Sequence, residues 1–170
     1  MNLTPRTQDP QPVDAGRLAG LRRYNVVVGI ILLVQAVAVV ALSNDFSLPV
    51  TASYLEGPPG TTPGAPVTLL DTPIGLAVAG FLALSGLALL LVATVWYSGY
   101  ARDLALQRNR ARWVEYALTS SMMIVLIAQI TGLTDVAALA AIFAVNAAMI
   151  LFGWLQEVYE SPGGGFLPFI

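Results

Sequence analysis

Four long apolar stretches, separated by polar segments, dominate the pattern of this chain. Each runs for about 20 residues, the length that a helix needs to cross the hydrocarbon core of a bilayer. None has the polar face of a surface helix, and a backbone inside lipid must satisfy its own hydrogen bonds, which selects helices. We therefore predict four transmembrane helices, over residues 24–42, 73–97, 113–133 and 134–157.

Four polar or mixed segments lie outside these spans. They comprise a tail (1–23), a long loop between the first two spans (43–72), a shorter loop (98–112) and a terminal linker (158–170). The apolar run at 166–170 stops without a cap or a polar tail, so we expect it to be the truncated start of a fifth helix.

Local signals refine this outline. Two runs on either side of the Gly- and Pro-rich centre of the long loop, residues 50–55 and 67–70, predict a β-hairpin. The sequences Asp71-Thr72-Pro73 and Thr134-Asp135 each offer an N-cap side chain, so we expect the second and fourth spans to start there.

The basic residues indicate orientation. All eight are arginines: four precede the first span and four lie between the second and third spans, which four crossings place on the same side. The charged residues on the opposite side are all acidic. The positive-inside rule therefore predicts a cytoplasmic N-terminus. The arginines are Arg6, Arg17, Arg22, Arg23, Arg102, Arg108, Arg110 and Arg112.

Composition excludes several functions. Hydrophobic residues make up 56% of the 170 residues and charged residues only 11%, against roughly 25% in soluble proteins. A soluble enzyme or a nucleic-acid binder is therefore excluded, and no enzyme signature is present. The chain contains no cysteine, histidine or lysine, which removes thiolate and imidazole metal ligands and any amine for a Schiff base. We predict no metal site and no nucleic-acid partner.

One carboxylate lies inside a predicted span. Glu115, with Thr119 and Ser120 about one turn further on, forms a polar patch near the cytoplasmic end of the third span. An ionisable side chain in a membrane is a candidate functional site. The alternative is that Glu115 pairs with Arg112 at headgroup depth and has no function. Asn146 in the fourth span is expected to bond a neighbouring helix.

The third and fourth spans resemble those of a known family. Residues 112–128, RWVEYALTSSMMIVLIA, resemble the third helix of heliorhodopsins, and residues 142–153, IFAVNAAMILFG, resemble the fourth. The cytoplasmic N-terminus and the long first outer loop also fit that family. The resemblance implies an all-α transmembrane fold, the first four helices of a seven-helix rhodopsin-like bundle.

The resemblance also implies a function. Heliorhodopsins are retinal-binding light receptors, regarded as photosensory or regulatory proteins and not as pumps, whose retinal is attached to a lysine in the seventh helix. Glu115 matches the counterion of the Schiff base, with Thr119 and Ser120 beside it. The other positions matching the retinal site or its polar network are Trp113, Tyr116, Met123, Asn146, Met149 and Gly153.

Two departures qualify this reading. Family members commonly place histidines near the Schiff base, and this chain has none, which leaves the proton acceptor unassigned. Without a lysine the 170 residues cannot bind retinal covalently, so we expect a fragment of a longer protein. The alternative is a complete four-helix structural or assembly protein without a chromophore; half of a transporter is less favoured, because no span is broken.

The resemblance and the charge pattern also predict the location and the partners of the protein. We expect a multi-pass protein of a prokaryotic plasma membrane, surrounded by lipid, forming a homodimer, and signalling to an unidentified cytoplasmic or membrane partner.

Overall fold

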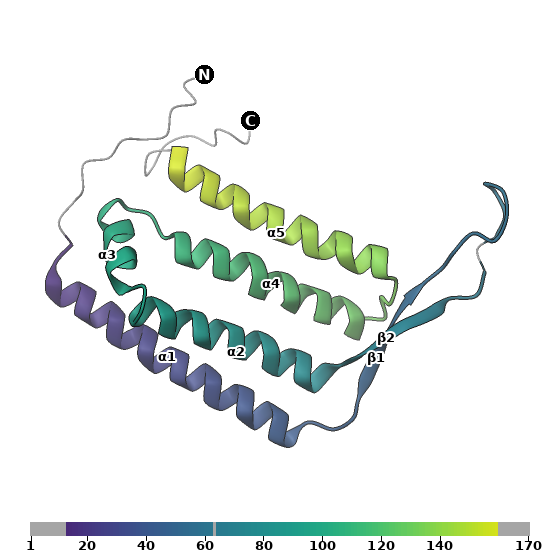
Figure 1. Ribbon diagram of the computed structural model, residues 1–170, viewed down its shortest axis with the longest axis horizontal. Coiled ribbons are helices and arrows are strands. Elements are labelled where there is room, and N and C mark those ends of the chain that lie inside the picture. The colour runs from purple at the N-terminus through teal and green to yellow at the C-terminus, as the bar shows by residue number, and fades with distance from the viewer. Residues whose placement is uncertain (1–12, 63, 160–170) are drawn as a thin grey trace.

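Four long helices lie side by side in a row. The computed structural model describes residues 13–62 and 64–159. Within the row each helix packs on the next in the order α1, α2, α4, α5, while the short helix α3 lies at one end and a two-stranded hairpin extends from the other (Figure 1). The elements are α1 (Ala15–Leu42), β1 (Ser47–Ala52), β2 (Val67–Pro73), α2 (Ile74–Ala93), α3 (Tyr97–Ala105), α4 (Arg110–Ile130) and α5 (Val136–Tyr159).

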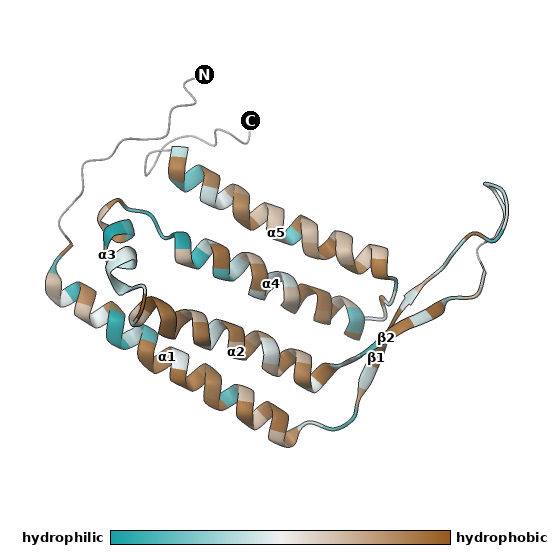
Figure 2. Cartoon of the chain, viewed as in Figure 1, coloured by the Kyte–Doolittle hydropathy of each residue, from teal (hydrophilic) through white to brown (hydrophobic). Residues whose placement is uncertain are grey.

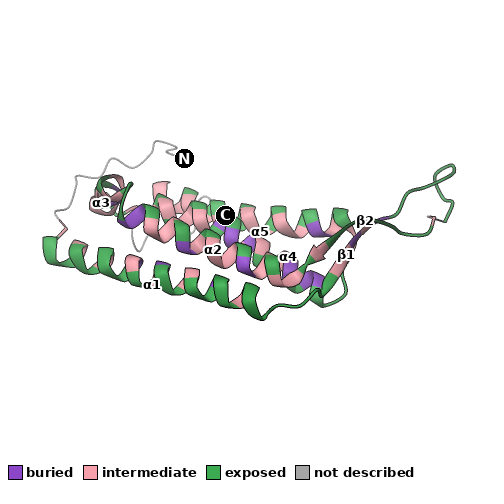
Figure 3. Cartoon of the chain, turned by 60° about the horizontal axis from the view of Figure 1, so that its bottom comes forward, coloured by how far each residue is buried: buried purple, intermediate pink, exposed green. Residues whose placement is uncertain are grey.

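The four long helices are apolar on most of their surface. Each is long and apolar enough to cross a membrane, which confirms the predicted all-α transmembrane class. Figure 2 shows apolar residues along the helices and more polar ones toward the ends, and Figure 3 shows exposed positions on every helix. Val37 and Val145 have exposed fractions of 69% and 70%. Such side chains are stable only where lipid or other protein covers them.

The helix ends differ from the predicted span limits. α1 begins at Ala15 and not at residue 24, because the side chain of Asp14 accepts a hydrogen bond from the Arg17 amide and caps the first turn. The predicted tail therefore contains two helical turns. The predicted start of a fifth helix at 166–170 lies outside the described residues.

The second span ends earlier than predicted. α2 stops at Ala93 and not at residue 97, and the predicted loop 98–112 contains the nine-residue helix α3. Arg22 of α1 replaces a missing backbone donor at this break, because its Nε donates to the Ala93 carbonyl at 2.9 Å. Its guanidinium lies 4.8 Å from the centre of the Tyr97 ring.

The predicted hairpin is confirmed. β1 and β2 are antiparallel, although β1 covers 47–52 in place of the expected 50–55. The shift has a cause in packing: Val50 and Ala52 are buried, and the Thr51 amide donates to the Thr134 carbonyl at 2.8 Å in the α4–α5 turn. Those contacts fix β1 against the bundle, and Tyr54 lies beyond it, exposed.

One of the two predicted N-caps is wrong. Asp71 and Thr72 belong to β2, and α2 begins after Pro73 without a side-chain cap, because strand pairing with β1 continues to the start of the helix. The other is confirmed: Asp135 Oδ1 accepts a hydrogen bond from the Ala138 amide at 2.9 Å.

Candidate functional site

Glu115 is held between two helices by hydroxyl donors. Its Oε1 accepts hydrogen bonds from Ser85 Oγ of α2 at 2.5 Å and from Thr119 Oγ1, one turn further along α4, at 3.0 Å. Both bonds are partly buried. Ser85 was not among the predicted site residues, because a lone serine in an apolar helix gives no signal of what it faces.

Glu115 does not form the ion pair with Arg112 that the alternative interpretation predicted. The Arg112 guanidinium instead lies 4.6 Å from the centre of the Trp113 ring. Across residues 13–62 and 64–159, the one ion pair found joins Arg110 to Asp103. The Glu115 carboxylate therefore has hydroxyl partners but no cationic one in the described part of the chain.

A cavity lined by both apolar and polar side chains adjoins this carboxylate. It has a volume of about 260 Å³ and lies between α1, α2 and α4 at the arginine-bearing end of the bundle. Asn25 has an exposed fraction of only 7%, and no hydrogen bond of its side chain is found among the described residues. Sequence reasoning missed Asn25, although an amide at the start of an apolar span is a signal. The polar lining residues are Tyr24, Asn25, Tyr100, Asn109, Arg112, Glu115 and Tyr116.

Asn146 joins α5 to α4. Its Nδ2 donates to Ser120 Oγ at 2.8 Å and to Ser121 Oγ at 3.0 Å, so it bonds a neighbouring helix as expected. Ser121 is fully buried and was not predicted. Ser120 Oγ in turn donates to the Tyr116 carbonyl at 2.7 Å. Ser120 therefore belongs to the contact between α4 and α5, whereas Thr119 belongs to the Glu115 cluster.

Trp113 joins the same two helices near the arginine-bearing end. Its Nε1 donates to Glu157 Oε2 at 2.7 Å, and the backbone N–H of Asn109 donates to the same oxygen at 3.0 Å. A Cβ at Gly153 would lie 2.6 Å from the Trp113 ring. In the structure Gly153 makes room for this indole, whereas its predicted role was to make room for retinal.

The remaining predicted residues do not meet Glu115 through any contact described in residues 13–62 and 64–159. Met123 and Met149 have exposed fractions of 43% and 63%, and Tyr116 lines the cavity with half of its surface exposed. Tyr116 and Met123 are seven residues apart on α4, so they share one face of that helix. Ser120, which bonds Asn146, lies between them on that face.

Fold and site together define a class of protein. Four apolar helices with a carboxylate bonded between two of them make a multi-pass helical membrane protein with a polar centre near one end. The sequence model of the heliorhodopsin family matches residues 21–170, nearly the whole chain. The chain therefore belongs to the heliorhodopsin family, as its third and fourth spans predicted. A search of curated proteins gave no match.

Proposed function

We propose that this protein serves as a retinal-binding light receptor with a sensory or regulatory role and no enzymatic one. The observation that carries the proposal is the Glu115 carboxylate, bonded by Ser85 and Thr119 beside a cavity of mixed apolar and polar lining, and without a cationic partner among the described residues. A carboxylate inside an apolar bundle is stable as an anion only when hydrogen bonds or a cation compensate its lost hydration.

Retinal, when bound to a lysine as a protonated Schiff base, supplies a cation that absorbs visible light. The residues present suit it: Glu115 would be the counterion, and Thr119 and Ser85 would hold its carboxylate in place. Trp113, Ser120 and Asn146 would keep α4 in register with α5. The exposed Tyr116, Met123 and Met149 offer apolar surface for a polyene.

The 170 residues contain no lysine, so the covalent bond requires one from outside them. The first experiment is to sequence the source DNA past codon 170. An in-frame continuation with three further apolar spans and a lysine in the last supports the proposal. A stop codon at 171, confirmed in the transcript, would overturn it and leave a four-helix structural or assembly protein as the function.

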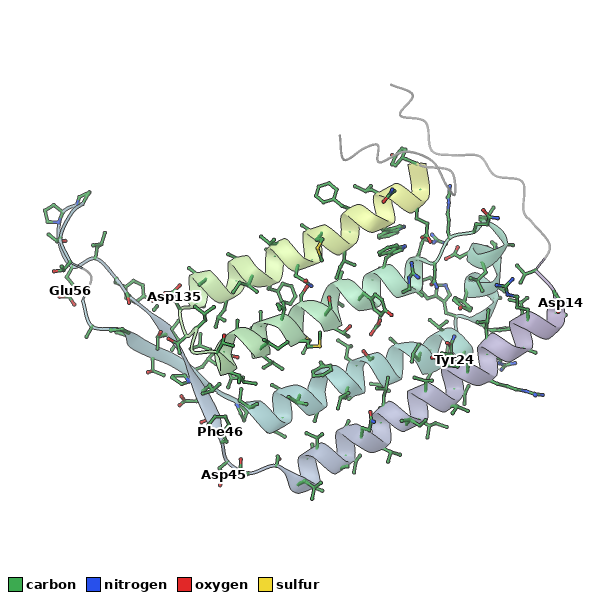
Figure 4. All side chains as sticks on the ribbon, turned by 180° about the vertical axis from the view of Figure 1, so that it is seen from behind. Asp14, Tyr24, Asp45, Phe46, Glu56 and Asp135 are labelled. Carbon is green, nitrogen blue, oxygen red and sulfur yellow. The ribbon has the colours of Figure 1, made fainter. Side chains whose placement is uncertain are left out.

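The role of Glu115 is tested in the pigment made from the continued chain. Glu115→Gln leaves the cation without its anion, so the visible band should shift to longer wavelength and be lost at lower pH than in the parent. Removing one partner of a buried charge pair costs about 3–5 kcal/mol, which makes this a large effect. Glu56→Gln is the control, because Glu56 is an exposed carboxylate in the loop of the hairpin, at the other end of the bundle (Figure 4). An unchanged spectrum in Glu115→Gln would contradict the assignment.

Orientation and assembly are part of the same proposal. The described arginines all lie at the end of the bundle that holds Asp14, whereas Asp45, Glu56 and Asp135 lie at the other (Figure 4). This charge asymmetry supports a cytoplasmic N-terminus. The membrane we propose is a prokaryotic plasma membrane. The exposed apolar side chains of the hairpin, Val67 and Leu70 among them, support a homodimer.

A further inference from the structure

The arginines at one end of the bundle divide by their contacts into two groups. Four have a side-chain partner or contact: Arg22 bonds the Ala93 carbonyl, Arg110 pairs with Asp103, Arg112 lies on Trp113, and Arg108 is also engaged. The other three described arginines are exposed, and their guanidinium groups have no partner among the described residues. They are Arg17, Arg23 and Arg102.

Helix lengths give the depth of these three arginines. α1 has 28 residues and so a length of about 42 Å, which matches the roughly 40–45 Å of a bilayer with its headgroups. α2 has 20 residues, or about 30 Å, which matches the hydrocarbon core alone. Residues 15–23 of α1, which hold Arg17 and Arg23, therefore reach from the edge of the core into the headgroup layer.

Arg102 lies in the same layer. The bond from Arg22 to the Ala93 carbonyl places the end of α2 beside the second turn of α1, and α3 begins four residues after Ala93. At this break Val95 and Trp96 have exposed fractions of 81% and 45%, which is the pattern of side chains that face lipid at a membrane interface. α3 therefore follows the headgroup layer.

We propose that Arg17, Arg23 and Arg102 each bind the phosphate groups of anionic phospholipids at this end of the bundle. Guanidinium groups bind phosphate oxygens through paired N–H donors, and three uncompensated cations at headgroup depth attract anionic lipid in preference to zwitterionic lipid. Among the described residues, acidic compensation at this end is limited: Asp103 is paired with Arg110, Glu157 is bonded to Trp113 and Asn109, and Asp14 accepts the backbone amide of Arg17. The proposal holds for either orientation of the chain in the membrane and does not depend on retinal.

The test uses the 170-residue chain in nanodiscs that contain equal amounts of phosphatidylglycerol and phosphatidylcholine, with bound lipid measured by native mass spectrometry after release. We expect retention of phosphatidylglycerol over phosphatidylcholine and a fall in that preference with salt. The preference should drop about fivefold for each arginine removed, so Arg17→Gln/Arg23→Gln/Arg102→Gln should abolish it. Circular dichroism checks that the variant stays helical; if it does not, the three single variants carry the test.

The matched control changes three charges at the other end: Asp45→Asn/Glu56→Gln/Asp71→Asn should retain anionic lipid as the parent does. Equal retention of the two lipids by the parent, or an unchanged preference in the triple arginine variant, would overturn the proposal. So would displacement of the lipid by millimolar inorganic phosphate, which would indicate a site for a free anion. Capture of RNA by nanodiscs of phosphatidylcholine alone, without any lipid preference, would also overturn it.

Discussion

Two pairs of neighbouring helices in this molecule are joined by different forces. α1 and α2 meet at two glycines: a Cβ at Gly86 would lie 2.9 Å from the Gly29 carbonyl oxygen, and a Cβ at Gly29 would lie 3.0 Å from the Gly86 carbonyl oxygen. α4 and α5 meet through polar side chains, with Asn146 bonded to two serines and Trp113 bonded to Glu157.

The difference follows from the solvent. Lipid gives apolar helices no hydrophobic reason to associate, so they join either by close approach of their backbones or by hydrogen bonds between polar side chains. The first pair uses backbone approach and carries little polar chemistry. The second pair uses hydrogen bonds on the helix that also carries Glu115. The second arrangement places polar groups along α4, and Ser85 of α2 adds one from the other side of that helix, where it bonds Glu115.

The largest effect is expected from filling the backbone contact. Gly86→Leu places a side chain against a backbone carbonyl that cannot move aside, and we expect a loss of about 3 kcal/mol in the free energy of unfolding. The measurement is unfolding of the purified chain in mixed detergent, followed by circular dichroism. Gly80→Leu is the matched control on the same helix, because nothing lies within 4 Å of a Cβ there. Equal stability of the two variants would show that α1 and α2 do not need the contact.

A smaller effect is expected where the neighbour is a side chain. Gly153→Ala brings a methyl group against the Trp113 ring, which can shift only by straining its bond to Glu157, so we expect a loss of about 1–2 kcal/mol. The Trp113 emission, recorded with Trp96 and Trp154 replaced by phenylalanine, should change as the indole moves. Gly80→Ala serves as control. If the emission and the stability both stay unchanged, the indole does not occupy the space at Gly153.

The smallest effect is expected from the polar contact. Asn146→Leu removes two hydrogen bonds to serines, and bonds of this kind inside bilayers contribute about 0.6 kcal/mol each, so we expect a loss of about 1 kcal/mol. Gln35→Leu is the matched control, because Gln35 is an exposed amide within α1 and no bond of its side chain is found among the described residues. A loss in the control as large as in Asn146→Leu would contradict the role given to the two serine contacts.

Local sequence was enough to predict the four spans, the hairpin and the cap at Asp135, because lipid solvation, turn formation and capping each act within a short stretch of chain. The family also followed from sequence, since residues 112–128 and 142–153 carry its pattern. The cap expected at Asp71 failed, because pairing of β2 with β1 extends to the start of α2 and depends on residues far away in the chain.

Which polar groups meet was decided by the tertiary structure. The sequence singled out Glu115 and Thr119, but not Ser85, 30 residues earlier, or Asn25, since each is a single polar residue in an apolar stretch and only helix packing brings them to one place. In the same way the sequence set the number of arginines and their two segments. Which arginine side chains have a partner within the protein depends on the break at Ala93 and on the position of α3. No local signal specifies either of these.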